Sequence, residues 1–352
     1  MTHPIRVERT TRPQSHPDPT QLGFGRFFTD HMFVMDYEKS RGWFDPRIVE
    51  HAAMQIDPAA GGLQYGQSLF EGLKAYATST GTVQMFRPDA HARRLNASAE
   101  RLCMPSIEVP VLVNAMRELL RVDRDWVPTA SGTSVYLRPT MFATEAFLGV
   151  RPSNQYALVV LASPVGAYFT GDARPLKIWV EKSYARAVRG GIGAAKTGGN
   201  YAASLLAAES AKKRGFDQVL WLDALHHADL EEVGTMNIVA VIGDEVVTPP
   251  LDGALLAGVT RDSVLTLLRE WGLKVSERTL PLQELIEAGR NGTLREIFGT
   301  GTAAVIAPVG ELAWDGGSIT ARGGEIGARL RETLEGLHYG RVADRWNWLT
   351  AV

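Results

Sequence analysis

Lys196 stands in a loop of small residues, "RGGIGAAKTGGNYAASLLAAESAKKRG", which runs from Arg189 to Gly215. A glycine-rich loop with a lysine often binds phosphate. A nucleotide-binding P-loop, however, requires G-x-x-x-x-G-K-[ST], and Ala195 occupies the place of its last glycine. The preceding "KSYARAVRG" is polar and does not resemble the buried strand that a P-loop follows. The sequence therefore disfavours nucleotide binding at Lys196.

A nucleophilic role for this lysine competes with the simpler interpretation of a solvated loop residue, which most lysines are. The flanking residues provide no carboxylate partner and little bulk: Ala194, Ala195, Gly198 and Gly199. A ligand could therefore approach the amine closely. A nucleophilic lysine must lose its proton, which burial or a nearby cation favours. Pyridoxal phosphate requires such a lysine, together with an acid for its pyridine nitrogen and a cup for its phosphate.

Two segments could form the phosphate cup. The N–H groups and the dipole at a helix N-terminus favour anions, and "LLAGVTRDS" places Gly258, Val259 and Thr260 at the start of a predicted helix. The second segment, "FGTGTAAVIAPVG", is a small, hydroxyl-rich loop that contains Thr300 and Thr302. Either segment could equally be an ordinary helix cap or turn.

The elements that would position these residues follow from hydrophobic periodicity. In the first half, strands are predicted at 31–37, 73–78, 83–88, 134–143 and 156–163, with helices near 88–103 and 110–122. The second half predicts strands at 176–182 and 218–224 and a hairpin over 237–250 that turns at Gly243-Asp244. Helices are predicted at 199–215, where Tyr201, Leu205 and Ala208 align, and at 260–272, with Thr260 as the N-cap.

This pattern predicts two domains of mixed α and β structure. Residues 1–20 are polar and proline-rich and are expected to form a disordered or extended arm. A smaller α+β domain is expected over 21–165, a glycine- and proline-containing linker over 166–175, and a larger cofactor-binding domain over 176–352.

The composition points to a small-molecule ligand and a reducing compartment. The net charge is −2 without a basic stripe, which argues against nucleic acid or an anionic membrane as a partner. The single cysteine, Cys103, cannot form an internal disulfide, and "HHADLEE" has no standard metal-ligand spacing, so no metal site is expected. No apolar stretch is long enough to span a bilayer. We expect a soluble, cytoplasmic protein.

Seven blocks together resemble the branched-chain amino acid aminotransferases. These are class IV pyridoxal-phosphate enzymes with the D-amino-acid-aminotransferase-like fold, called fold type IV, in which each domain is a sheet or barrel-like sheet with helices. The resemblance extends from about residue 25 to "DRWNWL" near the C-terminus. The blocks are "LQYGQSLFEGLKAY", "YLRPTMF", "AAKTGGNYAASLLA", "QVLWLDA", "EEVGTMNIV", "TPPLDGALLAGVTRDS" and "FGTGTAAVIAPVG".

The resemblance implies a role for each cofactor-binding position. Lys196 matches the lysine that forms the Schiff base, and Tyr201 matches the phenol beside the cofactor's O3′. Glu232 matches the carboxylate that keeps the pyridine nitrogen protonated, which makes the ring a better electron sink. The phosphate would be held by Arg94, Val259, Thr260 and Thr302, and Leu256 would pack against the ring.

The resemblance also implies a site that accepts two kinds of substrate. Tyr65, Phe70, Gly72 and Tyr168 match an apolar side-chain pocket, while Tyr136, Arg138 and the backbone N–H groups of Thr302 and Ala303 match groups that meet carboxylates. Leucine, isoleucine and valine would fit the first, and Arg138 would let the same site take glutamate. Ala304 and Ala307 replace the Cys-x-x-Cys switch of mammalian members, so thiol control is not expected.

The implied activity is reversible ping-pong transamination between branched-chain amino acids and 2-oxoglutarate, in a homodimer or larger homo-oligomer. Three alternatives remain open. A D-amino acid aminotransferase or an aminodeoxychorismate lyase would share the lysine and the phosphate cup. A P-loop phosphotransferase would bind ATP. A catalytically silent interaction protein would bind neither ATP nor the cofactor.

Overall fold

The computed structural model describes residues 4–166, 174–321 and 323–352, and it divides the chain into two compact units. The first unit comprises Met1–Tyr168, Ala195–Gly198 and Gly336–Val352, and the second comprises Phe169–Ala194 and Gly199–Glu335. Most of the linker expected at 166–175 lies outside the described residues. Lys196 belongs to the first unit, although the residues before and after its short segment belong to the second.

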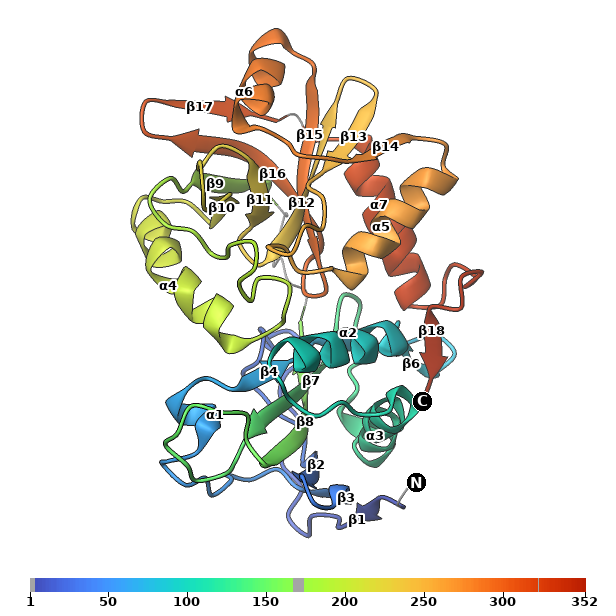
Figure 1. The fold of residues 1–352 in the computed structure, drawn as a ribbon. Helices are drawn as coiled ribbons and strands as arrows, with labels where there is room; N and C mark the ends of the chain where they lie inside the picture. The colour runs from blue at the N-terminus through green and yellow to red at the C-terminus, as the bar shows by residue number, and fades with distance from the viewer. Residues whose placement is uncertain (1–3, 167–173, 322) are drawn as a thin grey trace. The chain divides into compact units, whose positions relative to one another are not determined.

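A nine-stranded sheet frames the first unit, in the order β1-β3-β2-β8-β7-β5-β6-β18 with β4 paired to β7 (Figure 1). Its β8, "QYALVVLASPV", is rich in β-branched and apolar residues and is buried along most of its length. The last strand comes from the C-terminus and pairs with β6. The strands are β1 (Arg6–Val7), β2 (His31–Glu38), β3 (Gly42–Glu50), β4 (Ser68–Phe70), β5 (Leu73–Ala77), β6 (Val83–Phe86), β7 (Ser134–Ala143), β8 (Gln155–Val165) and β18 (Leu349–Ala351).

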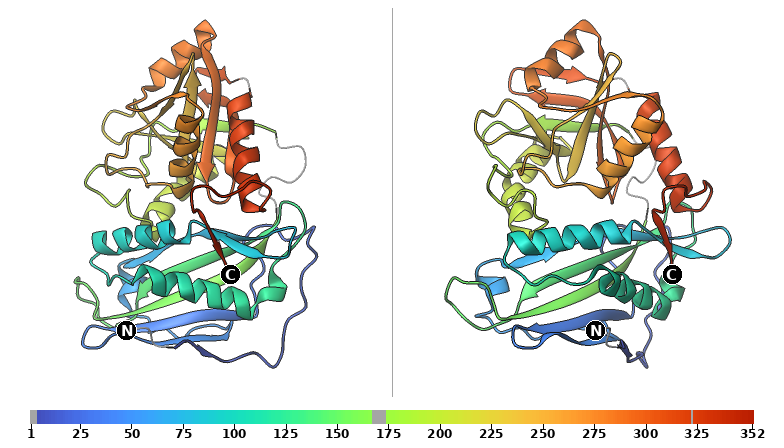
Figure 2. Two further views of the ribbon diagram at one scale, coloured as in Figure 1. Left: turned by 90° about the vertical axis from the view of Figure 1, so that its right-hand side faces the viewer. Right: turned by 45° about the vertical axis from the view of Figure 1, so that its right-hand side comes forward.

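Two helices pack against this sheet, α2 (Pro88–Arg101) and α3 (Val109–Val122), as Figure 2 shows. In α3, Leu112, Met116 and Leu119 recur at helical spacing and are buried. Both helices carry proline in the first turn, where the missing N–H leaves no hydrogen bond unmade. These helices confirm the expectations near 88–103 and 110–122. The unit also contains α1 (Gly61–Gln64) and a short 3₁₀ turn, η1 (Arg124–Trp126).

The second unit is built on a closed barrel. Six strands form a ring in the order β11-β10-β9-β16-β15-β12, which closes through pairing of β12 with β11. β13 and β14 extend the sheet, and β17 pairs with β16. This ring confirms the barrel-like sheet expected for fold type IV. The strands are β9 (Leu176–Val180), β10 (Gln218–Leu222), β11 (Leu230–Val233), β12 (Met236–Ile242), β13 (Glu245–Thr248), β14 (Lys274–Glu277), β15 (Leu294–Gly301), β16 (Val305–Trp314) and β17 (Gly317–Thr320).

Helices surround the barrel, with α4 on one side and α5 and α7 on the other (Figure 1). They are α4 (Gly198–Lys213), α5 (Val259–Glu270), α6 (Leu282–Asn291) and α7 (Glu325–His338), whose last residues return to the first unit. Within the described ranges, no helix combines the length and the apolar character needed to cross a membrane.

Two helical details differ from the sequence expectations. The N-cap of α5 is Gly258 rather than Thr260, because helical geometry already begins at Val259. In α4 the row that contains Leu205 does not face the core: Leu205 is 62% exposed, whereas Ala207 and Ala211 are buried. The hairpin over 237–250 is confirmed, with Ile242 opposite Glu245 and Gly243 at positive φ.

Candidate active site

Lys196 is fixed by its backbone between β4 and α2. Its N–H donates to Ser98 Oγ at 2.9 Å, and its carbonyl accepts the N–H of Phe70 at 2.9 Å. The next residue, Thr197, donates its hydroxyl to the carbonyl of Ser68 at 2.6 Å. The Lys196 side chain is half-buried, and its Nζ lies 4.8 Å from the centre of the Phe70 ring. The held backbone and the half-buried side chain argue against a freely solvated loop lysine.

Three of the predicted substrate residues meet beside a fourth, Phe70. The Arg138 guanidinium lies 4.6 Å from the centre of the Phe70 ring and donates to the Tyr136 hydroxyl at 3.0 Å. A Cβ at Gly72 would lie only 1.7 Å from that hydroxyl oxygen. Glycine is therefore required at position 72 for Tyr136 to occupy its place. The cluster combines an apolar face with a cation and a phenol.

Arg94 is oriented by Glu71, the residue between Phe70 and Gly72. Arg94 Nε donates to Glu71 Oε1 at 2.7 Å, and Arg94 Nη2 donates to Oε2 at 2.8 Å. Glu71 Oε2 also lies 2.8 Å from His91 Nδ1 and accepts the N–H of Gly72 at 3.1 Å. Glu71 is completely buried. A two-point contact of this kind fixes both the position and the plane of the guanidinium.

The charges in this network determine its protonation. Burial alone would raise the pKa of Glu71, but the charge and hydrogen bonds of Arg94, assisted by His91, hold that pKa far below its usual range. For His91, burial is the largest cause of a lowered pKa. Glu71 opposes this shift, and the charges of Arg94 and Lys196 add to it. Glu71 is therefore an anion beside the Arg94 cation, which is the predicted phosphate ligand.

Replacing Glu71 with glutamine should destabilise the cofactor-free protein by about 3–5 kcal/mol, because Arg94 would lose the partner of its buried charge. A bound phosphate would supply a new partner for Arg94. The loss in the free energy of unfolding should therefore be smaller when pyridoxal phosphate is present. Urea unfolding of both variants, with and without the cofactor, measures the difference.

The matched control for this experiment is Glu118→Gln, which removes the partner of Arg121 on the exposed face of α3. An exposed pair contributes at most about 1 kcal/mol, and the cofactor should not change that loss. If Glu71→Gln cost no more than the control, or if pyridoxal phosphate left its cost unchanged, Glu71 would not be the residue that orients Arg94.

The second unit contributes a buried acid on β11. Glu232 Oε2 pairs with Arg186 Nη2 at 2.9 Å, and Glu232 Oε1 accepts from Asn237 Nδ2 at 3.0 Å and from the N–H of Leu256 at 3.4 Å. Asn237 Nδ2 also donates to the carbonyl of Leu256 at 3.1 Å. Asn237 thus hydrogen-bonds both to Glu232, the predicted partner of the pyridine nitrogen, and to Leu256, which is predicted to pack on the ring. These groups form one network.

The N-terminus of α5 adjoins this network. Its N-cap, Gly258, is close to Asn237, where a Cβ would lie only 2.0 Å from Asn237 Oδ1. The predicted phosphate residues Val259 and Thr260 form the first turn, where backbone N–H groups have no carbonyl partner within the helix. A helix terminus of this kind favours an anion.

The other predicted residues of this unit lie on separate elements. Thr302 and Ala303 lie in the turn between β15 and β16, where the Thr300 hydroxyl donates to the carbonyl of Val305 at 3.0 Å. Tyr201 lies half-buried in the first turn of α4.

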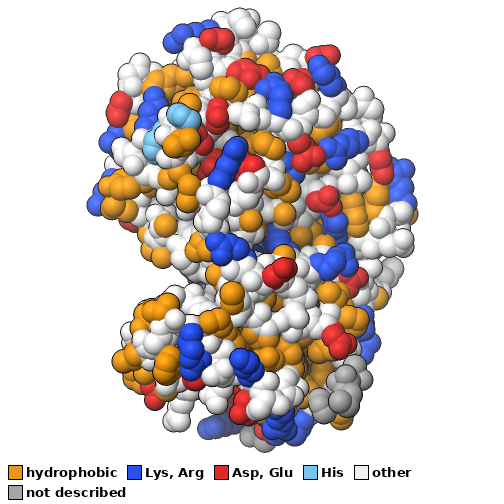
Figure 3. All heavy atoms as spheres, viewed as in Figure 1, with side chains coloured by type: hydrophobic (Ala, Val, Ile, Leu, Met, Phe, Trp, Pro, Cys, Tyr) orange, Lys and Arg blue, Asp and Glu red, His pale blue; other side chains and the backbone are white. Residues whose placement is uncertain are grey.

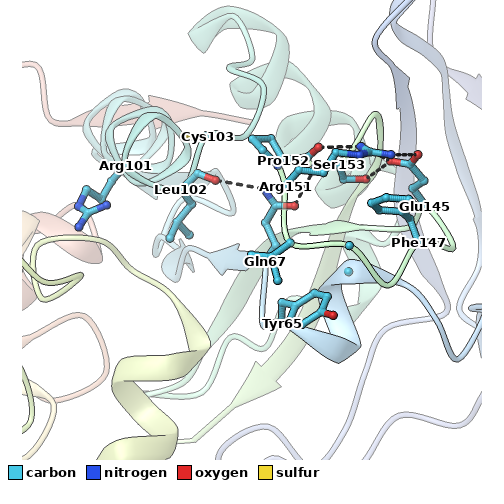
Figure 4. A pocket seen from close by; sticks show the side chains of 13 residues that line it. Tyr65, Gln67, Arg101, Leu102, Cys103, Glu145, Phe147, Arg151, Pro152 and Ser153 are labelled. Carbon is cyan, nitrogen blue, oxygen red and sulfur yellow. Dashed lines mark hydrogen bonds and ion pairs between the residues drawn. The ribbon is translucent and has the colours of Figure 1, made fainter.

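Two predicted substrate residues are not part of the Phe70 cluster. Tyr65 follows α1, is 50% exposed, and donates its hydroxyl to the carbonyl of Leu148. Figure 4 shows it beside a different pocket of about 380 Å³, near Phe147 and the Glu145–Arg151 ion pair. Tyr65 therefore does not lie in the Phe70 cluster, and its assignment to the substrate pocket stays a prediction. Tyr168 lies outside the described residues.

The residues of both units fit pyridoxal phosphate, the cofactor that the sequence resemblance implies. A buried carboxylate, Glu232, suits the pyridine nitrogen, and the N-terminus of α5 and the Arg94 guanidinium suit a phosphate. Lys196 supplies the amine, on a backbone that hydrogen bonds hold in place. The set thus contains each kind of group that this cofactor needs.

The sequence alone did not indicate the residues that orient these groups: Glu71, His91, Ser98, Arg186 and Asn237. A signal existed for Glu71, since an acid inside the apolar run "SLFEGLKAY" is costly unless it is paired. Asn237 likewise falls within the block that contains Glu232. Arg186 carried no comparable signal, because "KSYARAVRG" is polar throughout.

Residues 68–312 match the family described as amino-transferase class IV. This match spans more than half of the chain and includes both groups of site residues. The chain belongs to the class IV aminotransferases, which depend on pyridoxal phosphate. It is 50% identical to "Branched-chain-amino-acid aminotransferase 2" of Bacillus subtilis over 99% of this chain and 97% of that protein. It is 48% identical to "Branched-chain-amino-acid transaminase 1" of the same organism over the full length of both.

Solved structures agree with this assignment. The branched-chain amino acid aminotransferase of Escherichia coli aligns with a TM-score of 0.75 and 29% identity, covering 91% of this chain and 98% of that one. The branched-chain aminotransferase of the thermophilic archaeon Thermoproteus uzoniensis, solved with norvaline, aligns with a TM-score of 0.75 and 25% identity, covering 91% and 99%. The fold is therefore that of fold type IV aminotransferases.

Proposed function

We propose that this enzyme transfers the amino group of leucine, isoleucine or valine to 2-oxoglutarate, reversibly and in a ping-pong sequence. The observation that carries the proposal is the position of Arg138 over the Phe70 ring, at 4.6 Å. An aromatic face accepts a branched apolar side chain, and a guanidinium beside it accepts the second carboxylate of glutamate. The names of the full-length relatives support the same substrates.

Lys196 is the residue to which we assign proton transfer. When bound, pyridoxal phosphate supplies an electron sink for negative charge at the substrate's α-carbon. The Lys196 amine removes the α-proton of the donor amino acid and, in the second half-reaction, gives a proton to the α-carbon of the acceptor, which is general acid–base catalysis. Ser98 and Phe70 hold the lysine backbone, so the amine moves only through its own side-chain torsions.

The remaining residues bind and orient. Arg94, Val259, Thr260 and Thr302 hold the phosphate, with Glu71 keeping Arg94 in position. Glu232 holds the protonated pyridine nitrogen, Leu256 packs on the ring, and Tyr201 meets its hydroxyl. Gly72 and Tyr136 complete the substrate pocket with Arg138, and the backbone N–H groups of Thr302 and Ala303 bind the substrate carboxylate.

A substrate panel tests this function against its alternatives within the family. With 2-oxoglutarate as the acceptor, the three L-amino acids should give kcat/KM values at least about 100-fold above that of D-alanine. Glutamate should form in equal amount to the branched 2-oxo acid. Preference for D-alanine, or pyruvate release from aminodeoxychorismate, would assign the enzyme to another branch of the family.

We further infer that the enzyme is a homodimer or larger homo-oligomer. Apolar side chains gather over α1 and the loop after β7 (Figure 3), and we call Leu63, Tyr65, Phe147, Leu148 and Val150 the α1 patch. Leu148 is 62% exposed and Val150 is 84% exposed. An apolar patch of this kind on a monomer's surface marks an interaction site. If a second copy covered this patch, Tyr65 of the first copy would also lie near the substrate of the second copy.

Sedimentation of the holoenzyme checks this inference, because a dimer has twice the chain mass of 38.4 kDa. Leu148→Asp should shift the protein toward the monomer and lower activity with it. A monomeric, fully active wild type would contradict the inference.

A cytoplasmic location is proposed as well, since the lone Cys103 suits a reducing compartment. Activity recovered from a secreted fraction would oppose it.

A further inference from the structure

A second cavity of about 640 Å³ lies in the first unit, between β2, β3 and α3. We call it the α3 cavity. Its walls are mostly apolar and are formed by Phe33 and Met35 of β2, Trp43 of β3, Ile107, and Val111 of α3. Phe33, Met35 and Ile107 also belong to the hydrophobic core of this unit. Small-molecule sites commonly have this size and this apolar character.

One end of the α3 cavity carries an arginine with one unpaired donor. Asn114 and Arg117 line it three residues apart on α3, so both lie on the helix face that borders the cavity. Arg117 Nε is buried and has no hydrogen-bond partner within the described part of the chain. A buried donor left unpaired costs about 1–3 kcal/mol. An anionic group bound at this end would remove that cost.

The other charges around the cavity are compatible with an anion near Arg117. Arg41 is a second lining cation, with its guanidinium 3.9 Å from the centre of the Phe44 ring. Among the lining residues described, Glu108 is the one acid, and it lies nine positions before Arg117 on the same helix. This separation is about 13 Å along a helix axis. The positive end of the cavity is therefore distinct from its acidic end.

The α3 cavity is separate from the residues around Lys196. Lys196 is held by β4 and α2, through Phe70 and Ser98, whereas the cavity is built from β2, β3 and α3. A molecule in the cavity would therefore not occupy the substrate position beside Phe70. Its binding can be measured apart from turnover.

We propose that the α3 cavity binds an apolar monocarboxylate, with the carboxylate on Arg117 and the hydrocarbon against Trp43 and Val111, the partly buried apolar residues of its wall. Fatty acids and branched 2-oxo acids share this chemistry. The guanidinium presents a pair of N–H donors that matches the two carboxylate oxygens. The apolar walls account for the remaining affinity through burial of hydrocarbon.

Calorimetric titration of the cofactor-saturated holoenzyme tests the proposal, with decanoate and 4-methyl-2-oxopentanoate as separate ligands. At least one acid should bind at one site per chain, and its affinity should fall about tenfold or more in Arg117→Gln, through loss of a charge-assisted contact. Val111→Trp, which fills the apolar end, should weaken binding as well. Arg121→Gln on the exposed face of α3 is the matched control and should bind normally.

Turnover distinguishes this cavity from the catalytic site. Arg117→Gln should keep the wild-type kcat and KM for leucine, which also shows that the variant is folded. If Arg117→Gln weakens the binding of decanoate alone, the natural ligand is a long-chain acid. If it weakens the binding of 4-methyl-2-oxopentanoate, the natural ligand is a 2-oxo acid that resembles the reaction product. The proposal is overturned if Arg117→Gln and Val111→Trp bind both acids as wild type does, or if binding is purely competitive with leucine.

Discussion

Lys196→Ala should abolish amino-group transfer, with kcat reduced at least about 10²–10⁴-fold through loss of the proton-transferring amine alone. The fold should survive, because Lys196 makes its contacts with Ser98 and Phe70 through backbone atoms that alanine retains. The covalent link to the cofactor should also disappear, and with it the visible absorption band of the wild-type holoenzyme. Turnover of leucine and the absorption spectrum measure the two effects.

Two further variants separate charge from chemistry. Lys196→Arg keeps a cation at this position but cannot lose its proton, so it should be as inactive as the alanine variant. Lys182→Ala removes an exposed lysine that lies earlier in the chain and should behave as wild type. Exchange of the leucine α-proton with solvent deuterium, followed by NMR, reports the proton step directly. Continued exchange in Lys196→Ala would assign that step to another group.

The sequence indicated Lys196 as the candidate for the reacting lysine because its local surroundings are unusual, but it could not show how the lysine is held. Small residues on both sides of Lys196 are visible in the sequence. Its partners, Ser98 and Phe70, are 98 and 126 positions away in the chain and carry no local mark of that contact. Loop backbone is stabilised by whichever element the fold brings near, and this information is not encoded in the loop itself.

Hydrophobic periodicity predicted the positions of helices and strands better than it predicted which faces are buried and which strands pair. Periodicity predicted a helix near 110–122, and α3 spans Val109–Val122 with Leu112, Met116 and Leu119 buried at helical spacing. In α4, small residues such as Ala207 and Ala211 face the core while Leu205 is exposed, so hydrophobicity alone indicated the wrong face. The pairing of β18 with β6 was not predictable, because a three-residue strand has no sequence signature of its partner.

Tyr65 shows the limit of carrying a role over by motif. The family resemblance assigned Tyr65 and Phe70 to one substrate pocket. The structure instead turns the chain through α1, and Tyr65 contacts the loop that contains Leu148. A motif names candidate residues for a site but does not show how the chain arranges them.

Glu232→Gln should retain the cofactor yet lower kcat by about 10²-fold or more, because an amide cannot stabilise a protonated pyridine nitrogen as a carboxylate does. Glutamine has nearly the same volume, and its carbonyl can still accept from Asn237 Nδ2. Phosphate contacts and the Lys196 attachment should therefore persist, so that cofactor content remains near one per chain. The partner Arg186 would lose its buried counter-ion, which adds a stability cost.

The adjacent acid provides a matched control with a pH dependence of its own. Because neighbouring residues of a strand point to opposite faces, the Glu231 and Glu232 side chains leave β11 on different sides. Glu231 is buried, and burial raises its pKa to about 7. Its native pKa exceeds the unfolded value of 4.5, so its favourable contribution is complete below pH 4.5 and is lost as the pH rises through 7. Glu231→Gln should therefore gain stability on the order of 2 to 3 kcal/mol relative to wild type between pH 4.5 and pH 8.

These two substitutions give opposite results if the roles are assigned correctly. Glu231→Gln should keep wild-type turnover at pH 8 and unfold at higher urea than wild type. Glu232→Gln should lose turnover at every pH, because its carboxylate is needed for the chemistry rather than for the fold. If both variants lost activity equally, turnover would depend on the combined charge of Glu231 and Glu232 rather than on Glu232 alone. If Glu232→Gln kept its activity, a residue other than Glu232 would hold the ring nitrogen.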